Sequence, residues 1–404
     1  MESKRVVITG YGVNAPNISN ESDFRNVLIN GKCTYTVIPD IGPNGSSVVC
    51  GQINENFNII GGNNYHRYPR VSRLALAAAQ DAVGLAGWGR LNEFDANRVA
   101  VIIGSSAGGL LEIEEGTMFS RNQDYAAFPR LGASTGNFHS TASAVSAHFG
   151  LTGMSLTVGS GCTAGVDAIN MGKALIESGQ IDACLVGGAD APITSFSLYS
   201  FAKLRGIALN VDVCDTGVPF SMSHDGFVIA EGAAVLALET EESALRRGAY
   251  IYGVVQDVSS NNDAIAIHRS DSSGKSMLKA LKATLNGHRP SYVNSQALGL
   301  HENDRVEQYV HQQLFGKEVP LTSIKAMIGH PFAAAGVFQV ISALQSIEYG
   351  FIPGTTKTKA SGYENLPIVF ETRPSEVQSV AITTHGFGGN NTCLLITRLS
   401  KGLM

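Results

Sequence analysis

The chain has 404 residues, of which 44% are hydrophobic and 16% charged, and its net charge is −5. This length is enough for two modest globular units, and the charge argues against nucleic acid as a partner. There is no run of 18 apolar residues and no apolar signal core behind the first residues, so we expect no membrane span and a cytoplasmic location.

Short continuous apolar runs alternate along the chain with longer segments rich in Ala and Leu. The short runs predict buried strands and the longer segments predict helices, in a layered α/β fold with both faces of the sheet covered. Segments 40–65 and 255–275, rich in Gly, Asn and Ser, are expected to be loops. The expected strands are 5–10, 98–104, 182–188, 233–239, 251–257 and 393–397, and the expected helices are 72–87, 163–178, 275–286 and 331–349.

A charged segment after the strand at 233–239 indicates a seam near 245–252. We therefore predict an N-terminal half over 1–250 and a C-terminal half over 251–404. Each half closes on a strand followed by a Gly-rich turn that holds a reactive or donor residue. This parallel hints at duplication, although the two halves share no obvious residue identity.

The first motif with chemical content is SLTVGSGCTAGVDAINMG at 155–172. A strand-like run, a Gly-Ser-Gly turn and a helical stretch would place Cys162 on a sharp turn from strand to helix. A helix N-terminus beneath the sulfur would favour the thiolate. The alternative is a buried core cysteine, but the flanking pattern favours a nucleophile. The six cysteines form no CxxC pair, so neither a zinc site nor any other metal site is indicated.

The second motif is LTSIKAMIGHPFAAAG at 321–336, in which Lys325 precedes His330 and an Ala-rich helix follows. A neutral His at a helix N-terminus has a lowered pKa and can donate a hydrogen bond to a developing oxyanion. The alternative interpretation is a capping or core His with a surface Lys.

Two further motifs are weaker. AITTHGFGGNN at 381–391 runs from a strand into Gly-Phe-Gly-Gly, whose backbone N–H groups could form an oxyanion hole. TGVPFSMSHDGFVIAEG at 216–232 places acidic residues beside glycines, with Phe227 between them, and we interpret it largely as a structural turn.

Together these motifs resemble the β-ketoacyl-acyl-carrier-protein synthases, most of all the elongating synthases of fatty acid synthesis and the ketosynthases of bacterial type II polyketide systems. The matching stretches span essentially the whole chain, from RVVITGYGV through GCTAGVDAI, VGGADAPIT, PFSMSHDGFVIAEGAAVLALE, YVNSQALGLHENDRVE and SIKAMIGH to HGFGGNN. The resemblance implies the thiolase fold, with two similar βαβαβαββ-type halves stacked in five layers, α-β-α-β-α.

The resemblance also implies roles for individual residues. Cys162 would be the acyl-accepting nucleophile, His330 a catalytic histidine, Lys325 its supporting lysine, and Glu307 the carboxylate that orders this network. The amides of Cys162 and Phe387 would form the oxyanion hole. His385, Gly386 and Gly388 would contact the substrate.

The implied substrates and partners follow from the same family. No organic cofactor is implied, because the acyl group would arrive on the phosphopantetheine arm of an acyl carrier protein or on coenzyme A. The chain is expected to form a homodimer, or a heterodimer with a related ketosynthase.

The sequence departs from the family at three neighbouring points. Gln296 stands where the family's first catalytic histidine is expected, Ala297-Leu298 replaces a Gly-Thr pair, and His385 replaces a gating phenylalanine. Asp304 and Glu307 still match, so the alignment is not slipped, and His301 is not expected to substitute. Gln296 keeps an N–H donor but cannot carry a proton or a positive charge.

Four functions remain open from the sequence. The first is a ketosynthase that condenses with a Cys162–Gln296–His330 set, acting in polyketide or fatty acid biosynthesis. The second is a non-condensing acyl transferase or malonyl-carrier decarboxylase of a polyketide cluster. The third is a partner subunit like the chain-length factor, although such partners usually lack the cysteine. The fourth is a binding protein with a decayed site.

Overall fold

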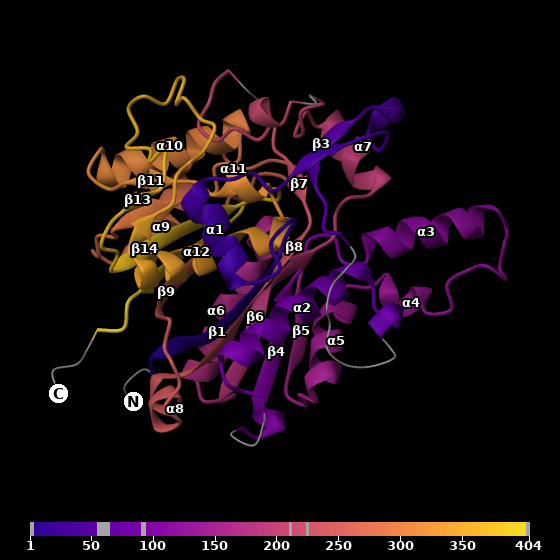
Figure 1. Ribbon diagram of the computed structural model, residues 1–404, viewed down its shortest axis with the longest axis horizontal. Helices are drawn as coiled ribbons and strands as arrows, with labels where there is room; N and C mark the ends of the chain where they lie inside the picture. The colour runs from indigo at the N-terminus through magenta and orange to yellow at the C-terminus, as the bar shows by residue number, and fades with distance from the viewer. Residues whose placement is uncertain (1–3, 55–64, 90–93, 210–211, 224–225, 401–404) are drawn as a thin grey trace.

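The computed structural model describes residues 4–54, 65–89, 94–209, 212–223 and 226–400, and within them ten strands form one sheet (Figure 1). Five strands of this sheet come from the first part of the sequence. They lie side by side in the order β5-β4-β6-β8-β1. Their bounds are β1 (Val6–Asn14), β4 (Val99–Gly104), β5 (Ser155–Val158), β6 (Ala183–Asp190) and β8 (Gly232–Thr240).

The other five strands repeat this arrangement in the order β11-β10-β14-β15-β9. In each set the first three strands in the order given are parallel to one another. The fourth strand is antiparallel to the third, and the fifth is antiparallel to the fourth. The repeated topology supports the hint of duplication, and we propose the boundary between the halves just before β9. The bounds are β9 (Gly253–Asn262), β10 (Tyr292–Asn294), β11 (Leu321–Thr322), β14 (Ser379–His385) and β15 (Asn390–Thr397).

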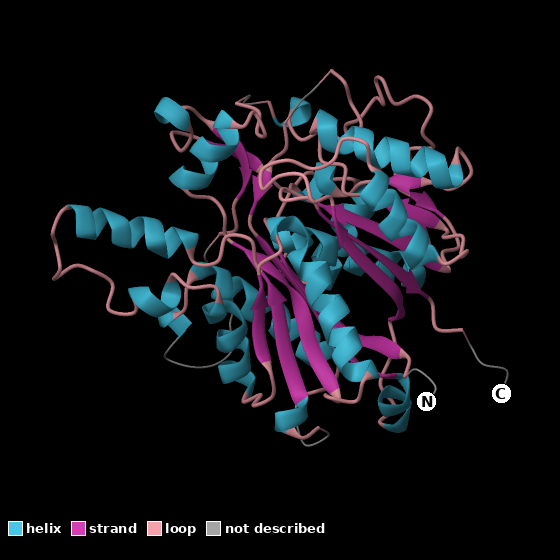
Figure 2. Ribbon diagram, turned by 180° about the vertical axis from the view of Figure 1, so that it is seen from behind, coloured by secondary structure: helices cyan, strands magenta, loops and turns pink. Residues whose placement is uncertain are grey.

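Helices lie on both faces of the two strand sets, as the sequence predicts. In the middle layer, α6 (Ala164–Glu177) and α12 (Ala335–Tyr349) share one apolar core with strands of both sets. The outer face of the first set is covered by α2 (Arg70–Leu85) and α5 (His139–Phe149), and that of the second by α9 (Lys275–Leu285) and α10 (His301–Phe315) (Figure 2). These are the five layers expected of the thiolase fold.

The middle helix α12 is mostly apolar and is buried on every side, because it is surrounded by protein. All its residues from Ala335 to Ile347 are buried. A helix that is hydrophobic all round belongs in the interior of a large core. Its position allows close contact with α6: a Cβ on Gly165 would lie 2.7 Å from Val337 Cγ2 of α12.

Smaller elements complete the described chain. They are α1 (Glu21–Asn30), β2 (Thr36–Ile38), β3 (Val48–Gly51), α3 (Leu110–Arg121), α4 (Gly132–Thr135), α7 (Ser195–Lys203), β7 (Ile229–Ala230), α8 (Glu241–Arg246), α11 (Lys325–Ile328), β12 (Phe351–Ile352) and β13 (Arg373–Pro374), with short 3₁₀ turns between them.

Both expected loops contain strand. β3 lies within 40–65 and pairs with β7 through Cys50 and Gly51, while residues 55–64 of that expectation fall outside the described part. β9 continues to Asn262, well into 255–275, because it pairs with β15 along its whole length. The polar Ser and Asn residues of β9 led to the prediction of a loop, but they belong to the partly exposed end of this strand.

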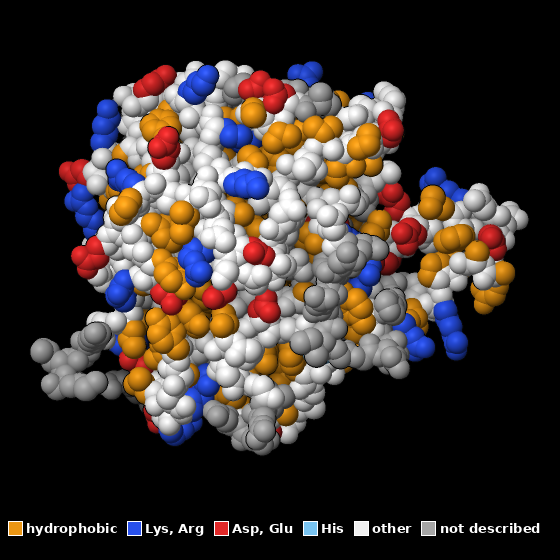
Figure 3. Space-filling model, in the orientation of Figure 1, with side chains coloured by type: hydrophobic (Ala, Val, Ile, Leu, Met, Phe, Trp, Pro, Cys, Tyr) orange, Lys and Arg blue, Asp and Glu red, His pale blue; other side chains and the backbone are white. Residues whose placement is uncertain are grey.

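A projecting arm carries α3 and α4 and stands away from the body (Figure 1). Its apolar side chains Ile113, Met118, Tyr125 and Phe128 are exposed, and Figure 3 shows apolar side chains gathered over this arm. Among the residues that the structure describes, no helix has both the length and the apolar character that crossing a bilayer requires.

Candidate active site

Cys162 lies in the turn that the sequence predicts, between β5 and α6. The turn is a single 3₁₀ unit, Gly161–Thr163, in which Gly161 has φ +74°, a conformation that favours glycine. The Gly-rich turn after β14 packs directly on Cys162. A Cβ on Gly386 would lie 3.0 Å from the Cβ and 3.2 Å from the Sγ of Cys162, so a side chain there would press on the cysteine.

His330 faces the nucleophile from the other half of the chain. Its Nε2 lies 3.3 Å from the Sγ of Cys162. The backbone is fixed by hydrogen bonds, because the His330 N–H donates to the Val228 oxygen and the Ala230 N–H donates to the His330 oxygen. The rings of Phe227 and Phe332 pack against the imidazole at 5.5 and 5.2 Å between centroids.

The electrostatics of this pair differ from the prediction of a resting thiolate. Burial is the largest cause and the charge of Asp190 the second; together they raise the pKa of the Cys162 thiol to about 12, and Lys325 only partly opposes them. Burial also lowers the pKa of His330 well below its usual value, and the positive charge of Lys325 adds to this effect. The pair therefore rests as a thiol beside a neutral imidazole, which can take the proton when the sulfur attacks.

The turn after His330 holds a strained residue. Phe332 has φ +39°, which is unfavourable for a residue with a side chain. The next amide, that of Ala333, donates to the buried carboxylate of Asp190, which also accepts hydrogen bonds from Ser105 and from the amide of Ala107. This carboxylate thus holds the turn so that the Phe332 ring covers His330.

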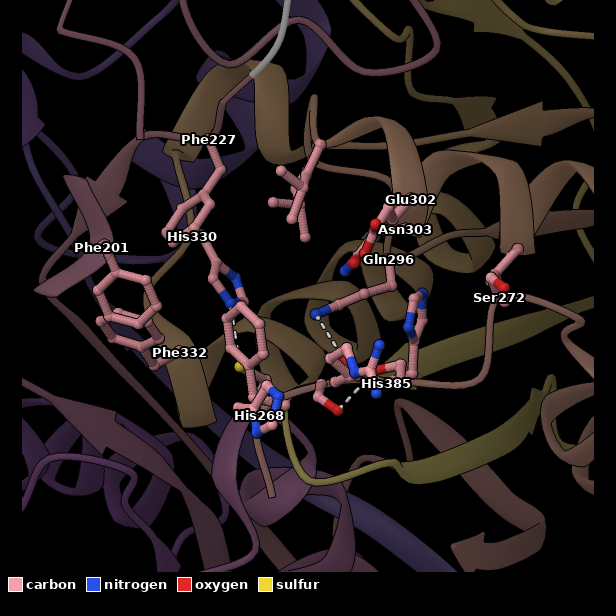
Figure 4. Close-up of a pocket in the computed structure, with 18 residues that line it drawn as sticks. Phe201, Phe227, His268, Ser272, Gln296, Glu302, Asn303, His330, Phe332 and His385 are labelled. Carbon is pink, nitrogen blue, oxygen red and sulfur yellow. Dashed lines mark hydrogen bonds between the residues drawn. The ribbon is translucent and has the colours of Figure 1, made fainter. Parts of the chain in front are cut away.

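Gln296 follows β10 and is fully buried in the same pocket. Its backbone N–H donates to Glu307 Oε1 at 3.1 Å, and its side-chain Nε2 donates to the backbone oxygen of His385 at 3.2 Å (Figure 4). Its Oε1 has no hydrogen-bond partner. The backbone just beyond it is fixed by Asp304, which accepts hydrogen bonds from the amides of Leu298 and Gly299.

Lys325 and Glu307 stand behind the pocket and do not line it. Lys325 Nζ donates to Gln339 Oε1 at 3.0 Å, and Glu307 accepts from Thr383 Oγ1 at 2.9 Å. Burial lowers the pKa of Lys325 to about 7, with the charge of Glu307 acting in the opposite direction. Lys325 acts on His330 through its charge, since its hydrogen bond goes to Gln339.

The Gly-rich turn runs from Gly386 to Gly389 between β14 and β15. His385 and Phe387 line the pocket, and the Phe387 ring lies 6.0 Å from that of Phe201. Gly388 has φ +87° and lies outside the pocket lining, with its carbonyl held by Asn262. The proposed oxyanion amides of Cys162 and Phe387 belong to adjoining turns, and their role stays a prediction.

The pocket holds about 640 Å³ of empty space, part of it open to solvent. Most of the residues that line the pocket were not predicted from the sequence. Phe227 was interpreted as part of a structural turn but packs on His330, and Asp225 of the same motif lies outside the described residues. Phe332 stands two residues after His330, so its motif could have identified it. The other unpredicted lining residues are Phe201, His268, Arg269, Ser270, Ser272, Leu300, Glu302, Asn303 and Val306.

Comparisons with known proteins find the same family along nearly the whole chain. The family model described as beta-ketoacyl synthase, N-terminal domain, matches residues 3–244, and the corresponding C-terminal domain model matches residues 252–359. A tetracenomycin polyketide synthase ketoacyl synthase alpha subunit from Streptomyces glaucescens is 30% identical over 428 residues, covering 98% of this chain and 97% of that one.

Two more comparisons extend this similarity. A 3-oxoacyl-[acyl-carrier-protein] synthase 2 from Staphylococcus aureus is 31% identical over 425 residues, covering 98% of this chain and 99% of that one. The solved structure of the ishigamide ketosynthase/chain length factor superposes with a TM-score of 0.89, at 23% identity, over 98% of this chain and 100% of that chain. At that identity, the structural match concerns the fold alone.

Proposed function

Because the chain belongs to the β-ketoacyl synthase family, we propose that it takes an acyl group onto Cys162 and condenses it with a malonyl-type thioester. One observation carries the proposal. A cysteine on a strand-to-helix turn has a neutral imidazole nitrogen 3.3 Å from its sulfur, inside a pocket. This is the geometry of an activated nucleophile, in which the base lies within reach of the proton.

The first half-reaction is acyl transfer. His330 Nε2 accepts the thiol proton while the Cys162 sulfur attacks the carbonyl of the incoming thioester. The carbon–sulfur bond to the carrier breaks, and His330 returns the proton to the departing carrier thiol. Backbone amides of the turns at Cys162 and Phe387 would stabilise the oxyanion that forms on the way.

The second half-reaction forms a carbon–carbon bond. The extender loses carbon dioxide, and the electrons of the broken bond pass to its thioester oxygen as an enolate. The enolate carbon attacks the acyl-Cys162 carbonyl, and the Cys162 sulfur leaves as a thiolate that regains a proton. The enolate oxygen needs hydrogen-bond donors, and losing one such donor typically costs about 10²–10³ in rate.

The substrates would be carried on phosphopantetheine. The acyl side of the pocket is aromatic and apolar, with Phe201, Phe227, Phe332 and Phe387, and suits a hydrocarbon chain. None of the described residues form a cluster of three or more metal-ligating groups, and the mechanism above uses no metal. The name of the Staphylococcus aureus relative includes an acyl carrier protein, and we propose such a protein as the partner that delivers both thioesters.

A non-condensing activity is the second candidate, and Gln296 is the observation that favours it. One N–H of its amide is bonded to the His385 backbone, and an amide cannot transfer a proton as a histidine can. A chain-length-factor-like role is less well supported, because Cys162 is retained with His330 beside it. Acyl transfer without condensation therefore remains the main alternative.

A second subunit is proposed from the edge of the sheet and from the comparisons. β5 is the last strand of the order, and Met154 and Leu156 beside this free edge are 42% and 37% exposed. An unpaired edge strand is a natural site for pairing with another chain. The relative named an alpha subunit and the structure named a ketosynthase with a chain length factor favour a related ketosynthase as the partner, and a second copy of this chain is the other candidate.

The deciding experiment is intact-mass analysis of the protein and of carrier protein loaded with an acyl group or with malonate. We expect wild type to gain one acyl mass, and the mixture to yield a β-ketoacyl-carrier with loss of carbon dioxide. Cys162→Ala should take up no acyl group, whereas Cys214→Ala, which alters an exposed cysteine, should behave as wild type. Acylation that persists in Cys162→Ala would refute the proposal, and acylation without a β-ketoacyl product would select the non-condensing alternative.

A further inference from the structure

We propose that His385 is a second catalytic imidazole, which donates a hydrogen bond to the thioester oxygen of the extender as that oxygen becomes an enolate. This inference rests on the proposed function and adds a residue to it. His385, at the end of β14, would supply the imidazole that the family pattern leads one to expect at position 296.

His385 is buried in the pocket without a hydrogen bond of its own. It is 1% exposed and lines the same pocket as Cys162, His330 and Gln296 (Figure 4). Neither of its ring nitrogens has a hydrogen-bond partner within the described protein. Buried polar groups are nearly always satisfied, so an imidazole of this kind on a pocket wall indicates that its partner is a ligand.

Glu307 orients this imidazole from behind. Glu307 Oε1 lies 3.4 Å from His385 Nε2, and the same carboxylate is fixed by Thr383 Oγ1 and by the amide of Gln296. A carboxylate beside one ring nitrogen favours a proton there and stabilises the imidazolium. With Nε2 on the side of Glu307, Nδ1 is the nitrogen left for a substrate, to which it donates when both ring nitrogens carry a proton.

Gln296 is better placed to hold residue 385 than to replace a histidine. Its Nε2 donates to the His385 backbone oxygen, and its Oε1 is an acceptor, which cannot stabilise an enolate oxygen. His385 and His330 lie close enough that the charge of His385 contributes to lowering the pKa of His330. The two imidazoles therefore serve one pocket, with His330 beside the sulfur and His385 beside the carboxylate.

The step leaves the charges balanced. The bond between the extender carboxylate and its α-carbon breaks, carbon dioxide departs, and the electron pair moves onto the thioester oxygen. That oxygen accepts hydrogen bonds from His385 and from the N–H of His330. The pair then returns as the new carbon–carbon bond forms, so His385 donates throughout and ends in its starting protonation state.

The test replaces the two residues that depart from the family pattern, His385 and Gln296, by the residues that the family would have there. His385→Phe installs the phenylalanine expected at this position, and Gln296→His in the same chain returns an imidazole to the other wall. For each variant, acylation of Cys162 is followed by intact mass and carbon dioxide release from malonyl-carrier is followed separately. His311→Phe is the matched control, because His311 is also a buried histidine close to Glu307, yet it lies outside the pocket.

We expect His385→Phe to lose about 10²-fold or more in carbon dioxide release, while the rate of acylation stays within about threefold. The double variant should recover at least about tenfold over His385→Phe, and His311→Phe should match wild type. Carbon dioxide release at the wild-type rate in a folded His385→Phe would overturn the assignment of His385. If wild type itself forms no acyl-Cys162, the proposed function fails first and the role of His385 falls with it.

Discussion

The reactive pair shows how burial can reverse the effect expected from a helix N-terminus. A cysteine ahead of a helix is expected to have a lowered pKa, yet the surroundings of Cys162 raise its pKa to about 12. The dipole of α6 acts in the opposite direction but is outweighed by desolvation and by Asp190. Activation then depends on His330, which is neutral and lies 3.3 Å away.

This balance predicts a steep pH dependence for alkylation of Cys162 by iodoacetamide. Only the thiolate reacts, so below the pKa its fraction increases about tenfold per pH unit. We expect the rate constant to rise in this way from about pH 7 to about pH 9 without a plateau, as measured by peptide mass after timed quenching. A plateau with a midpoint below about pH 8 would mean instead that Cys162 and His330 rest as an ion pair.

Local motifs pointed to Cys162 as a candidate nucleophile and to His330 as a candidate catalytic histidine, but the other walls of the pocket could not be predicted in this way. Cys162 and His330 were found because each sits in a motif whose spacing has a chemical meaning. Phe201, from α7, and His268, from the segment after β9, reach the pocket only through the packing of distant elements. Gln296 and His385 were recognised as departures, but their contact through the His385 carbonyl required the coordinates.

At the scale of elements, the position of the nucleophile depends on the contact between α6 and the turn before α12. A Cβ on Gly165 would lie 2.3 Å from the Ala333 oxygen and 2.7 Å from Val337 Cγ2, so Gly165→Ala must push these elements apart. Such overpacking costs about 1–3 kcal/mol. We expect a lower urea midpoint and slower acylation of Cys162, because α6 follows the sulfur and the turn before α12 follows His330.

A matched helix glycine provides the control. Gly84 lies in α2, is exposed, and has no atom within 4 Å of the position of a new Cβ. Gly84→Ala should stabilise the protein by about 0.5–1 kcal/mol and leave acylation unchanged, because alanine favours the helical backbone. Equal effects of the two substitutions would show that the close contact at Gly165 has no special role.

The elements themselves were predicted best where apolar runs were long. The strands around 98–104 and 182–188 and the helices around 72–87 and 163–178 match β4, β6, α2 and α6 within a few residues. β10 and β11 were not predicted. They have three and two residues, and such short strands show no hydrophobic periodicity in the sequence. α10 was missed as a helix because its outer face is polar, although Asp304 and Glu307 on its buried face were recognised from the family pattern.

At the scale of the molecule, most of the apolar stretch 151–192 lies in the core and does not provide an apolar surface for a partner. β6 is entirely buried and α6 largely so, which leaves the free edge at β5 as the exposed part. The proposal of a second subunit therefore depends on this edge and on the comparisons, and the exposed apolar side chains of the arm add to it. The arm side chain Tyr125, 93% exposed, is the clearest sign of a surface that a partner would cover.

We predict that the purified chain sediments with the mass of two chains, alone or with a related ketosynthase. Leu156→Lys should shift the mass to that of one chain, because it places a charge on the free strand edge. Leu245→Lys is the control, since Leu245 is 61% exposed on α8, far from β5 in the sheet order, and should leave the mass unchanged. A one-chain mass for wild type at micromolar concentration, both alone and with a related ketosynthase added, would contradict the prediction.

The place of β1 in the sheet has a consequence for biosynthesis on the ribosome. β1 is complete at Asn14, but the strands on its two sides, β8 and β9, begin only at Gly232 and Gly253. At about 5–20 residues per second, the first strand waits on the order of ten seconds or more with both edges unpaired. Cys162 is also translated well before His330 and the turn at Gly386, so the nascent chain carries a thiol without its imidazole partner until His330 has also been made and folded.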